Sequence, residues 1–148
     1  MESIETTVPA GPGDRPFRQP LVLHARARSG AETDWARIAA LYGALAQLAP
    51  SPVVELNRAV ALSMAIGPAV GLEVVDGLRA EPSLQAYHLL PSVRGDLLMK
   101  LGRLDEARQE FQRAASLTRN ARERELLLER AAECARGVAA AEQPGLPA

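Results

Sequence analysis

Aromatic residues and cysteine are both scarce in this sequence. Phenylalanine, tryptophan and tyrosine make up only 3% of its 148 residues, so a hydrophobic core has to be built from leucine, alanine and valine. Leucine and alanine favour helix, and apart from the valines nothing enriches strand-forming residues. Cys134 is the single cysteine, which excludes an intramolecular disulfide and fits a reducing cytoplasm.

An excess of positive charge and a long apolar run are also missing. The 17 basic and 18 acidic side chains give a formal net charge of -1, whereas general nucleic-acid binding relies on many basic side chains at the phosphates. No segment approaches the roughly 20 apolar residues of a membrane span. Residues 1–20 lack the charged-then-apolar order of a signal peptide. We therefore expect a cytoplasmic protein with no membrane partner and no direct nucleic-acid binding.

Proline and glycine divide the chain into three parts. Four prolines and two glycines crowd residues 1–20, so we expect residues 1–30 to form a disordered leader with a possible short helix over 21–29. A helical domain is expected over residues 31–138 and a disordered tail over residues 139–148.

Within the expected domain, apolar residues recur every three or four positions, which is the pattern of amphipathic helices. Pro91 falls inside the fourth segment, where it either kinks the helix or marks its true start. Short connections predict that successive helices pack as antiparallel neighbours, and no segment alternates as a strand would. The six predicted segments are 34–49, 52–66, 68–79, 84–101, 104–117 and 120–136.

The helix starts have recognisable capping signals. Asp34 is expected to cap the first helix, and Ser51 followed by Pro52 is a strong start signal for the second. Asn120 with Glu123 resembles a capping box for the last helix. The first helix also has a continuous apolar stripe, expected to face the core, at Trp35, Ile38, Leu41, Tyr42, Leu45 and Leu48.

A repeat pattern covers the fourth and fifth segments. Small residues stand where two helices would cross closely, a glycine stands at the turn, and an aromatic residue stands where it would fill the gap between the helices. These positions resemble the tetratricopeptide consensus, and they are Gly95, Leu98, Gly102, Ala107, Phe111 and Ala114. The fold predicted from them is all-α, with antiparallel helix hairpins stacked as a short tetratricopeptide-like solenoid of about six helices.

A second and degenerate unit lies one repeat upstream. Gly67 precedes Gly102 by about one tetratricopeptide length, but Leu72 and Asp76 stand where the small and aromatic residues belong. Because about three hairpins are normally needed for a stable stack, the first and last helices are expected to cap it.

Several separate runs resemble one known family in the right order. They are Thr33 to Ile38, Ser51 to Val60, Tyr87 to Leu90 and Leu117 to Asn120. These runs are similar to the C-terminal extension of a group of extracytoplasmic-function sigma factors, which are bacterial RNA polymerase sigma factors with a tetratricopeptide-like domain after their promoter-binding regions. The resemblance extends from residue 32 to residue 136.

The family's polymerase-binding and promoter-reading regions are not visible in this chain. The resemblance therefore implies a regulatory or scaffolding role in transcription, with no promoter recognition by this chain itself. The implied partner is a protein: the sigma factor's own core regions, RNA polymerase or a signalling protein. Two alternatives stay open, namely a small-molecule sensor and a structural dimeriser that packs through Ala131, Ala132 and Ala135.

Candidate contacts for such a partner come mainly from the repeat register. Asn57 falls where tetratricopeptide domains face their concave groove, and asparagine with arginine suits a carboxylate. An internal hydrogen bond or salt bridge explains Asn57 and Arg58 equally well. Trp35 is either a partner anchor or a core residue, and the apolar stripe favours the core. The complete set of candidates is Asn57, Arg58, Arg94, Trp35, Tyr87 and His88.

No set of residues predicts catalysis or cofactor binding. We find no nucleophile with a base, no phosphate-binding glycine loop and no paired carboxylates, so we expect no enzyme and no cofactor. His88 has only His24 as a second histidine, and no spacing matches a metal site. Cys134 lies on an apolar helix face and is expected to be a buried, inert thiol. The mixed charges of the last helix predict a solvated face.

Overall fold

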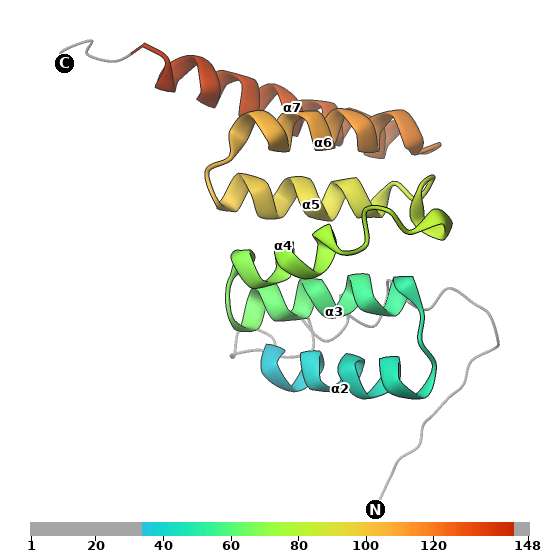
Figure 1. The fold of residues 1–148 in the computed structure, drawn as a ribbon. Coiled ribbons are helices and arrows are strands. Elements are labelled where there is room, and N and C mark those ends of the chain that lie inside the picture. The colour runs from blue at the N-terminus through green and yellow to red at the C-terminus, as the bar shows by residue number, and fades with distance from the viewer. Residues whose placement is uncertain (1–33, 144–148) are drawn as a thin grey trace, which may run out of the picture. The chain divides into compact units, whose positions relative to one another are not determined.

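The computed structural model describes residues 34–143 of the chain. This part contains six α-helices and one short 3-10 helix, with no strand among these residues, and each α-helix packs against the next in chain order. Figure 1 shows the helices stacked one above another. The prediction of an all-α stack of antiparallel helix hairpins is confirmed. The elements are α2 (Trp35–Leu48), α3 (Pro52–Ala65), α4 (Pro68–Asp76), η1 (Pro82–Leu84), α5 (Leu89–Lys100), α6 (Leu104–Leu117) and α7 (Ala121–Ala141).

The helix starts follow the capping signals in part. The carboxylate of Asp34 accepts a hydrogen bond from the backbone N–H of Arg37 (3.0 Å), as a side-chain cap should. Ser51 precedes α3 as predicted, with Pro52 at its first position, but its hydroxyl makes no capping bond. Proline needs no N–H partner there, and it sets the helical backbone angle without one.

The start of α7 has only half of the predicted capping box. The side chain of Asn120 accepts a hydrogen bond from the backbone N–H of Glu123 (2.9 Å). The return bond is absent, because the carboxylate of Glu123 accepts instead from the hydroxyl of Thr118 (2.6 Å). Thr118 in turn accepts from the backbone N–H of Asn120, so its hydroxyl stands between the two capping residues.

The structure contradicts the first third of the fourth predicted helix, which was expected over residues 84–101. Residues 82–84 form the 3-10 turn η1, and the α-helix begins only at Leu89, so Pro91 is its third residue. The first N–H groups of a helix have no partner within the helix, so a proline here removes no hydrogen bond. Pro91 therefore marks the start of α5. Leu84 is nevertheless buried, because η1 still places it in the core.

Two other boundaries differ from the prediction. Helix α4 ends at Asp76, three residues early, and α7 continues to Ala141, beyond the predicted helix end at 136 and into the expected tail over 139–148. The expected leader over 1–30 lies outside the described residues, as do the last five residues of the tail.

The α5–α6 hairpin is held by close contact at the repeat positions. A Cβ atom added to Gly95 would lie 2.9 Å from Cε1 of Phe111, so the missing side chain makes room for the ring. Phe111, Ala107 and Ala114 of α6 are fully buried beneath α5. Gly102 has a φ of +80° in the turn, which glycine adopts without strain.

The α3–α4 hairpin reaches the same closeness by a different residue. A Cβ atom added to Gly71 of α4 would lie 2.6 Å from Cβ of Ser63 and 2.8 Å from the carbonyl oxygen of Ala59. The glycine at the crossing is thus on the second helix of this unit, whereas Gly95 is on the first helix of the other. One core runs from α3 to α7 through both hairpins.

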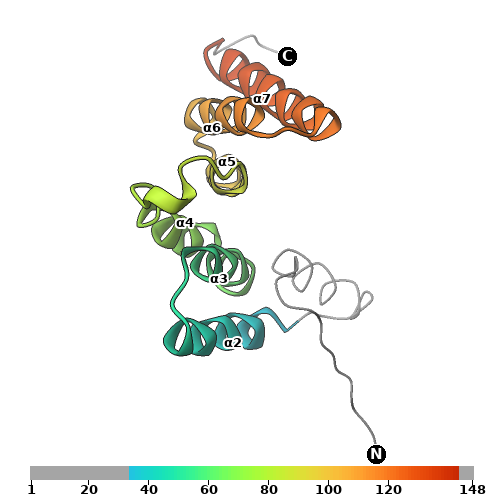
Figure 2. The same ribbon diagram turned by 90° about the vertical axis from the view of Figure 1, so that its right-hand side faces the viewer.

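The two ends of the described stack differ in polarity. Helix α7 exposes mainly charged residues and alanine, as expected of a capping helix, together with Leu126 and Leu128. Helix α2 buries only Ile38 and Ala39 completely. The expectation that its whole stripe faces the core is therefore wrong, because Leu41, Leu45 and Leu48 are 58%, 38% and 84% exposed. In Figure 2, α2 is the terminal helix and α3 separates it from the other helices.

Candidate functional site

Arg94 is the most enclosed charged side chain among the candidates. It extends from α5 toward α4 and α6, where its Nε donates to Oδ1 of Asp76 (2.8 Å) and its Nη1 lies 3.2 Å from Oε2 of Glu110. The Arg94 side chain is 7% exposed and that of Glu110 is 13% exposed, while Asp76 is 44% exposed. Arg94 is therefore engaged inside the stack.

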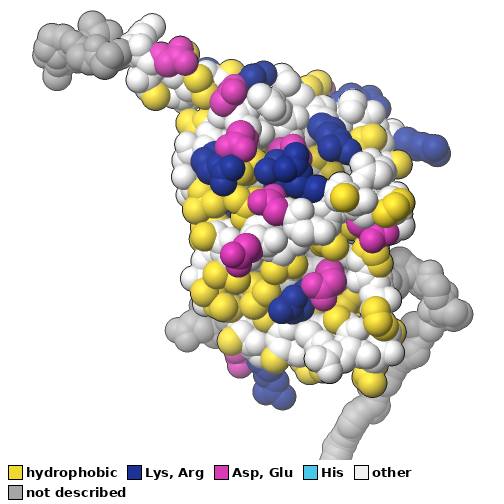
Figure 3. All heavy atoms as spheres, viewed as in Figure 1, with side chains coloured by type: hydrophobic (Ala, Val, Ile, Leu, Met, Phe, Trp, Pro, Cys, Tyr) yellow, Lys and Arg dark blue, Asp and Glu magenta, His cyan; other side chains and the backbone are white. Residues whose placement is uncertain are grey.

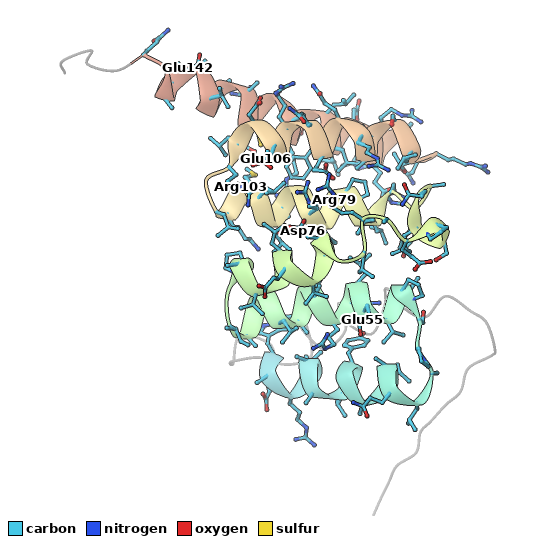
Figure 4. The ribbon with its side chains drawn as sticks, viewed as in Figure 1. Glu55, Asp76, Arg79, Arg103, Glu106 and Glu142 are labelled. Carbon is cyan, nitrogen blue, oxygen red and sulfur yellow. The ribbon has the colours of Figure 1, made fainter. Side chains whose placement is uncertain are left out.

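A second ion pair lies beside this one at the surface. Nε of Arg103 donates to Oε1 of Glu106 over 2.7 Å. This hydrogen bond is the largest cause of the lowered pKa of Glu106, and the charges of Arg103, Arg94 and Arg79 add to it. Figure 4 labels Asp76, Arg79, Arg103 and Glu106 along this face, and Figure 3 shows charged side chains of both signs gathered there. On this face the arginine side chains pair with neighbouring carboxylates, so their opposite charges neutralise one another.

Asn57 and Arg58 lie elsewhere, on α3. The side chain of Asn57 donates to the carbonyl oxygen of Val53 within the same helix (3.1 Å), and Arg58 donates to Glu55 (3.0 Å). Arg58 also borders α2, because an added Cβ on Gly43 would lie 3.7 Å from its Nε. The hydrogen-bond partners of Asn57 and Arg58 thus lie within α3, whereas those of Arg94 lie on α4 and α6.

Trp35 is the first residue of α2 and is half-buried, so neither of its two interpretations is excluded. Tyr42 lies seven residues, or about two helical turns, after it and is also half-buried. Burial raises the pKa of the Tyr42 hydroxyl above its ordinary value.

Tyr87 and His88 lie where α5 begins, close to the first turn of α7. Nε2 of His88 is buried and lies 3.1 Å from Oε1 of Glu123 without forming a hydrogen bond, a contact that is an ion pair only while the imidazole is protonated. The rings of Tyr87 and His88 meet edge to face, with 6.2 Å between centroids. We call Tyr87, His88, Thr118, Arg119 and Glu123 the edge cluster.

The edge cluster joins two of the sequence runs that carry the family resemblance. Tyr87 and His88 come from the run 87–90, and Thr118 and Arg119 come from the run 117–120. The hydroxyl of Thr118 and the imidazole of His88 both approach Oε1 of Glu123. Arg119 is exposed beside them, and the side chain of His88 is 25% exposed. The cluster therefore combines a fixed inner part with an accessible outer part.

Sequence reasoning missed a network around Asp96 of α5. Its carboxylate accepts from Nη2 of Arg130 on α7 (2.8 Å) and lies 3.0 Å from Nζ of Lys100. Burial alone would raise the pKa of Asp96, but the hydrogen bonds and charges of Lys100 and Arg130 outweigh it and hold the pKa below its ordinary value. The guanidinium of Arg130 also covers the ring of Phe111 at 4.8 Å from its centroid. No helical spacing relates residues 96 and 130, so only the fold brings them together.

Cys134 is buried on the inner face of α7 with 1% exposure. Burial raises the pKa of its thiol, which disfavours the reactive thiolate. Within residues 34–143, no three His, Cys, Asp or Glu side chains come together as a metal site would require. In the same part of the chain, none of the helices combines the length and apolar character needed to cross a bilayer.

The described residues thus offer an ion-pair network, the edge cluster and an apolar end. Comparison with known proteins adds one relationship. The chain is 50% identical over 101 residues to an uncharacterized protein of Rhizobium meliloti (strain 1021). The match covers 68% of this chain and 23% of that protein, so the chain spans less than a quarter of the relative's length. No family model matches the sequence, and no solved structure matches it.

Proposed function

We propose that this chain is a non-catalytic protein-interaction domain that regulates transcription initiation in the cytoplasm, in the manner of the sigma-factor extension that its sequence resembles. The partner would be a sigma factor's polymerase-binding and promoter-binding regions. The observation that carries the proposal is the edge cluster, in which two separate runs of the resemblance meet at one partly exposed place.

The chemistry of the edge cluster suits a protein partner. Tyr87 offers an apolar ring with a polar tip, a combination that is common at interfaces. Arg119 is exposed and makes no ion pair or hydrogen bond with residues 34–143, so a partner's carboxylate would meet a charged donor. The contact between His88 and Glu123 holds the start of α5 against α7, which keeps the exposed members in fixed positions.

The size of the Rhizobium relative supports a role inside a larger protein. A helical unit that corresponds to less than a quarter of a longer chain has neighbours in that chain with which it can pack. The regulatory contact we propose would then be made either within one chain or between two.

A binding experiment tests the proposal. We would titrate the purified chain with the isolated polymerase-binding and promoter-binding regions of an extracytoplasmic-function sigma factor, by isothermal calorimetry. The double variant Tyr87→Ala/Arg119→Ala should bind about thirtyfold more weakly, since each side chain contributes about 1 kcal/mol at such an interface.

The matched control for this titration is Arg103→Ala. Arg103 lies in the turn after α5, at the opposite end of that helix from the edge cluster. Its replacement should leave the affinity unchanged. Absence of any binding by the wild-type chain would refute the sigma-factor role, and equal losses for both variants would refute the edge cluster as its surface.

A further inference from the structure

The outer face of α2 exposes an apolar stripe at the end of the described stack. Leu41, Leu45 and Leu48 are separated by four and three residues, and Ile38 continues the spacing inward. Steps of three and four are those at which one α-helix meets another along a seam. Large exposed apolar side chains gathered on one helix usually mark a contact surface.

Charge on this face is sparse and unevenly placed. Arg37 is the single charged residue within α2, and it lies in the first turn, whereas the last turn has no basic residue. Around the leucines the exposed residues are Ala40, Ala44 and the uncharged Gln47. Small side chains let a second helix approach closely, and the lack of carboxylates leaves little to desolvate.

We propose that this face binds the same face of a second copy of the chain, with the two α2 helices antiparallel. About a two-fold axis near Gly43, Leu41 would meet Leu45 of the other copy and Leu45 would meet its Leu41, whereas Ile38 is 7% exposed and stays in the chain's own core. The contact is then self-complementary, as a closed two-fold dimer requires.

The charges select the antiparallel arrangement. Antiparallel pairing places each Arg37 beside the C-terminal end of the other α2, where the helix carries partial negative charge and has no basic residue of its own. Parallel pairing would instead bring the two Arg37 side chains and the two positive helix ends together. The dimer is independent of the proposed function, because the edge cluster lies just before α5 and around the start of α7, and none of its residues is on α2.

The area predicts a weak dimer. A helix of 14 residues is about 21 Å long at 1.5 Å per residue. One pair of such helices buries less than the roughly 1,200 Å² of a stable interface, so we expect dissociation in the micromolar range.

Analytical ultracentrifugation of the full chain tests the dimer. The wild-type chain should shift from monomer to dimer between about 1 and 500 µM, as a micromolar dissociation constant requires. Leu45→Glu should raise the dissociation constant about a hundredfold or more, because a two-fold interface contains the change twice. Leu128→Glu is the control, since Leu128 is an equally exposed leucine (48%) on α7 and its change should leave the dimer intact.

Disulfide trapping tests the orientation. Ala44→Cys lies near the proposed axis and should form a disulfide-linked dimer on oxidation. Leu48→Cys should not, because antiparallel helices would hold the two sulfur-bearing positions about 15 Å apart along the axis. Circular dichroism would verify that each variant folds. A wild-type chain that stays monomeric, a dimer lost in Leu128→Glu, or trapping at 48 in place of 44 would each overturn the proposal.

Discussion

Arg94 of α5 donates to Asp76 of α4 over 2.8 Å, and this ion pair joins the two repeat units. In the repeat register, Asp76 holds the position that Phe111 holds in the second unit. At this repeat position the first unit therefore has a carboxylate that pairs with the next helix, α5, whereas the second unit has a ring that packs on Gly95 within its own hairpin. The same guanidinium reaches Glu110 of α6, so one side chain links three helices.

Replacing Arg94 with methionine should destabilise the domain strongly. The methionine keeps much of the side-chain volume, but Glu110 is left with 13% exposure and without its cation. Losing one partner of such a buried pair costs about 3–5 kcal/mol. Urea unfolding followed by circular dichroism would measure the loss. Adding Glu110→Met to Arg94→Met should restore much of the stability. If the double variant instead loses the sum of the two single-variant losses, the buried ion pair is not the cause.

Asp76→Ala provides the matched comparison for Arg94→Met. Asp76 is 44% exposed, and Arg94 keeps Glu110 when Asp76 is removed. The expected cost is about 1 kcal/mol or less, as for partly solvated ion pairs. A cost equal to that of Arg94→Met would show that Asp76 is the main partner.

Gly95→Ala should destabilise the α5–α6 hairpin although alanine is the better helix former. The added methyl group would lie 2.9 Å from the ring of Phe111, and overpacking of this kind costs about 1–3 kcal/mol. Gly43→Ala is the control, since its methyl group meets nothing closer than 3.7 Å. That variant should gain up to about 1 kcal/mol from helix propensity. The melting temperatures of both variants would measure these effects. A Gly95→Ala variant that is more stable than the wild type would disprove the close contact.

Asp96 should give the fold a measurable acid sensitivity. Its native pKa lies below the ordinary value, so the carboxylate stabilises the fold above the unfolded pKa, and this contribution is lost as pH falls through the native pKa. Asp96→Asn should therefore cost on the order of 1 kcal/mol at pH 7, a modest amount because Asp96 is one-third exposed. The difference from wild type should shrink as the pH falls below the ordinary aspartate pKa and through the lowered native one.

Urea midpoints at several pH values would measure the Asp96 effect. Asp105→Asn serves as the comparison, because Asp105 pairs with Arg108 at a far more exposed position. Its effect should be small at every pH. A difference between wild type and Asp96→Asn that grows toward low pH would reverse the sign of the argument.

Cys134 should react with a thiol reagent only when the domain opens. The side chain is 1% exposed, and burial raises the pKa of its thiol. A domain stable by about 5 kcal/mol is open less than one part in a thousand of the time, so modification should be slowed by roughly that factor relative to the denatured chain. The variant Cys134→Ala/Ala135→Cys should react at once, because position 135 is exposed. Fast labelling of the native wild type would contradict the packing of α7.

Local signals in the sequence were enough to find most helices and their ends. Asp34 and Asn120 cap α2 and α7 because their side chains reach backbone groups only three residues away. Pro91 left two interpretations open, since its cost depends on whether earlier residues are helical. The start of α5 at Leu89 was decided by where η1 and Leu84 pack.

Candidate contacts could be named from the sequence but not grouped. The register placed Asn57 and Arg94 together, yet Arg94 turns toward acidic residues on α4 and α6 that no local spacing connects to it. The pairing of Asp96 with Arg130 was missed for the same reason. Long side chains choose partners across helix interfaces, and those partners depend on how the helices are stacked.

By itself, the sequence determined the all-α class, the helix hairpins and the close crossing at Gly95, because periodicity, capping and small residues act over short distances along the chain. Only the tertiary structure decided which apolar helix faces are buried in the core. The stripe of α2 looked like a core face, but among the described helices α2 packs chiefly against α3, and a helix needs neighbours on two sides to cover both of its faces. Leu41 and Leu48 are exposed because burial depends on the number of packed helices as well as on the pattern of residues.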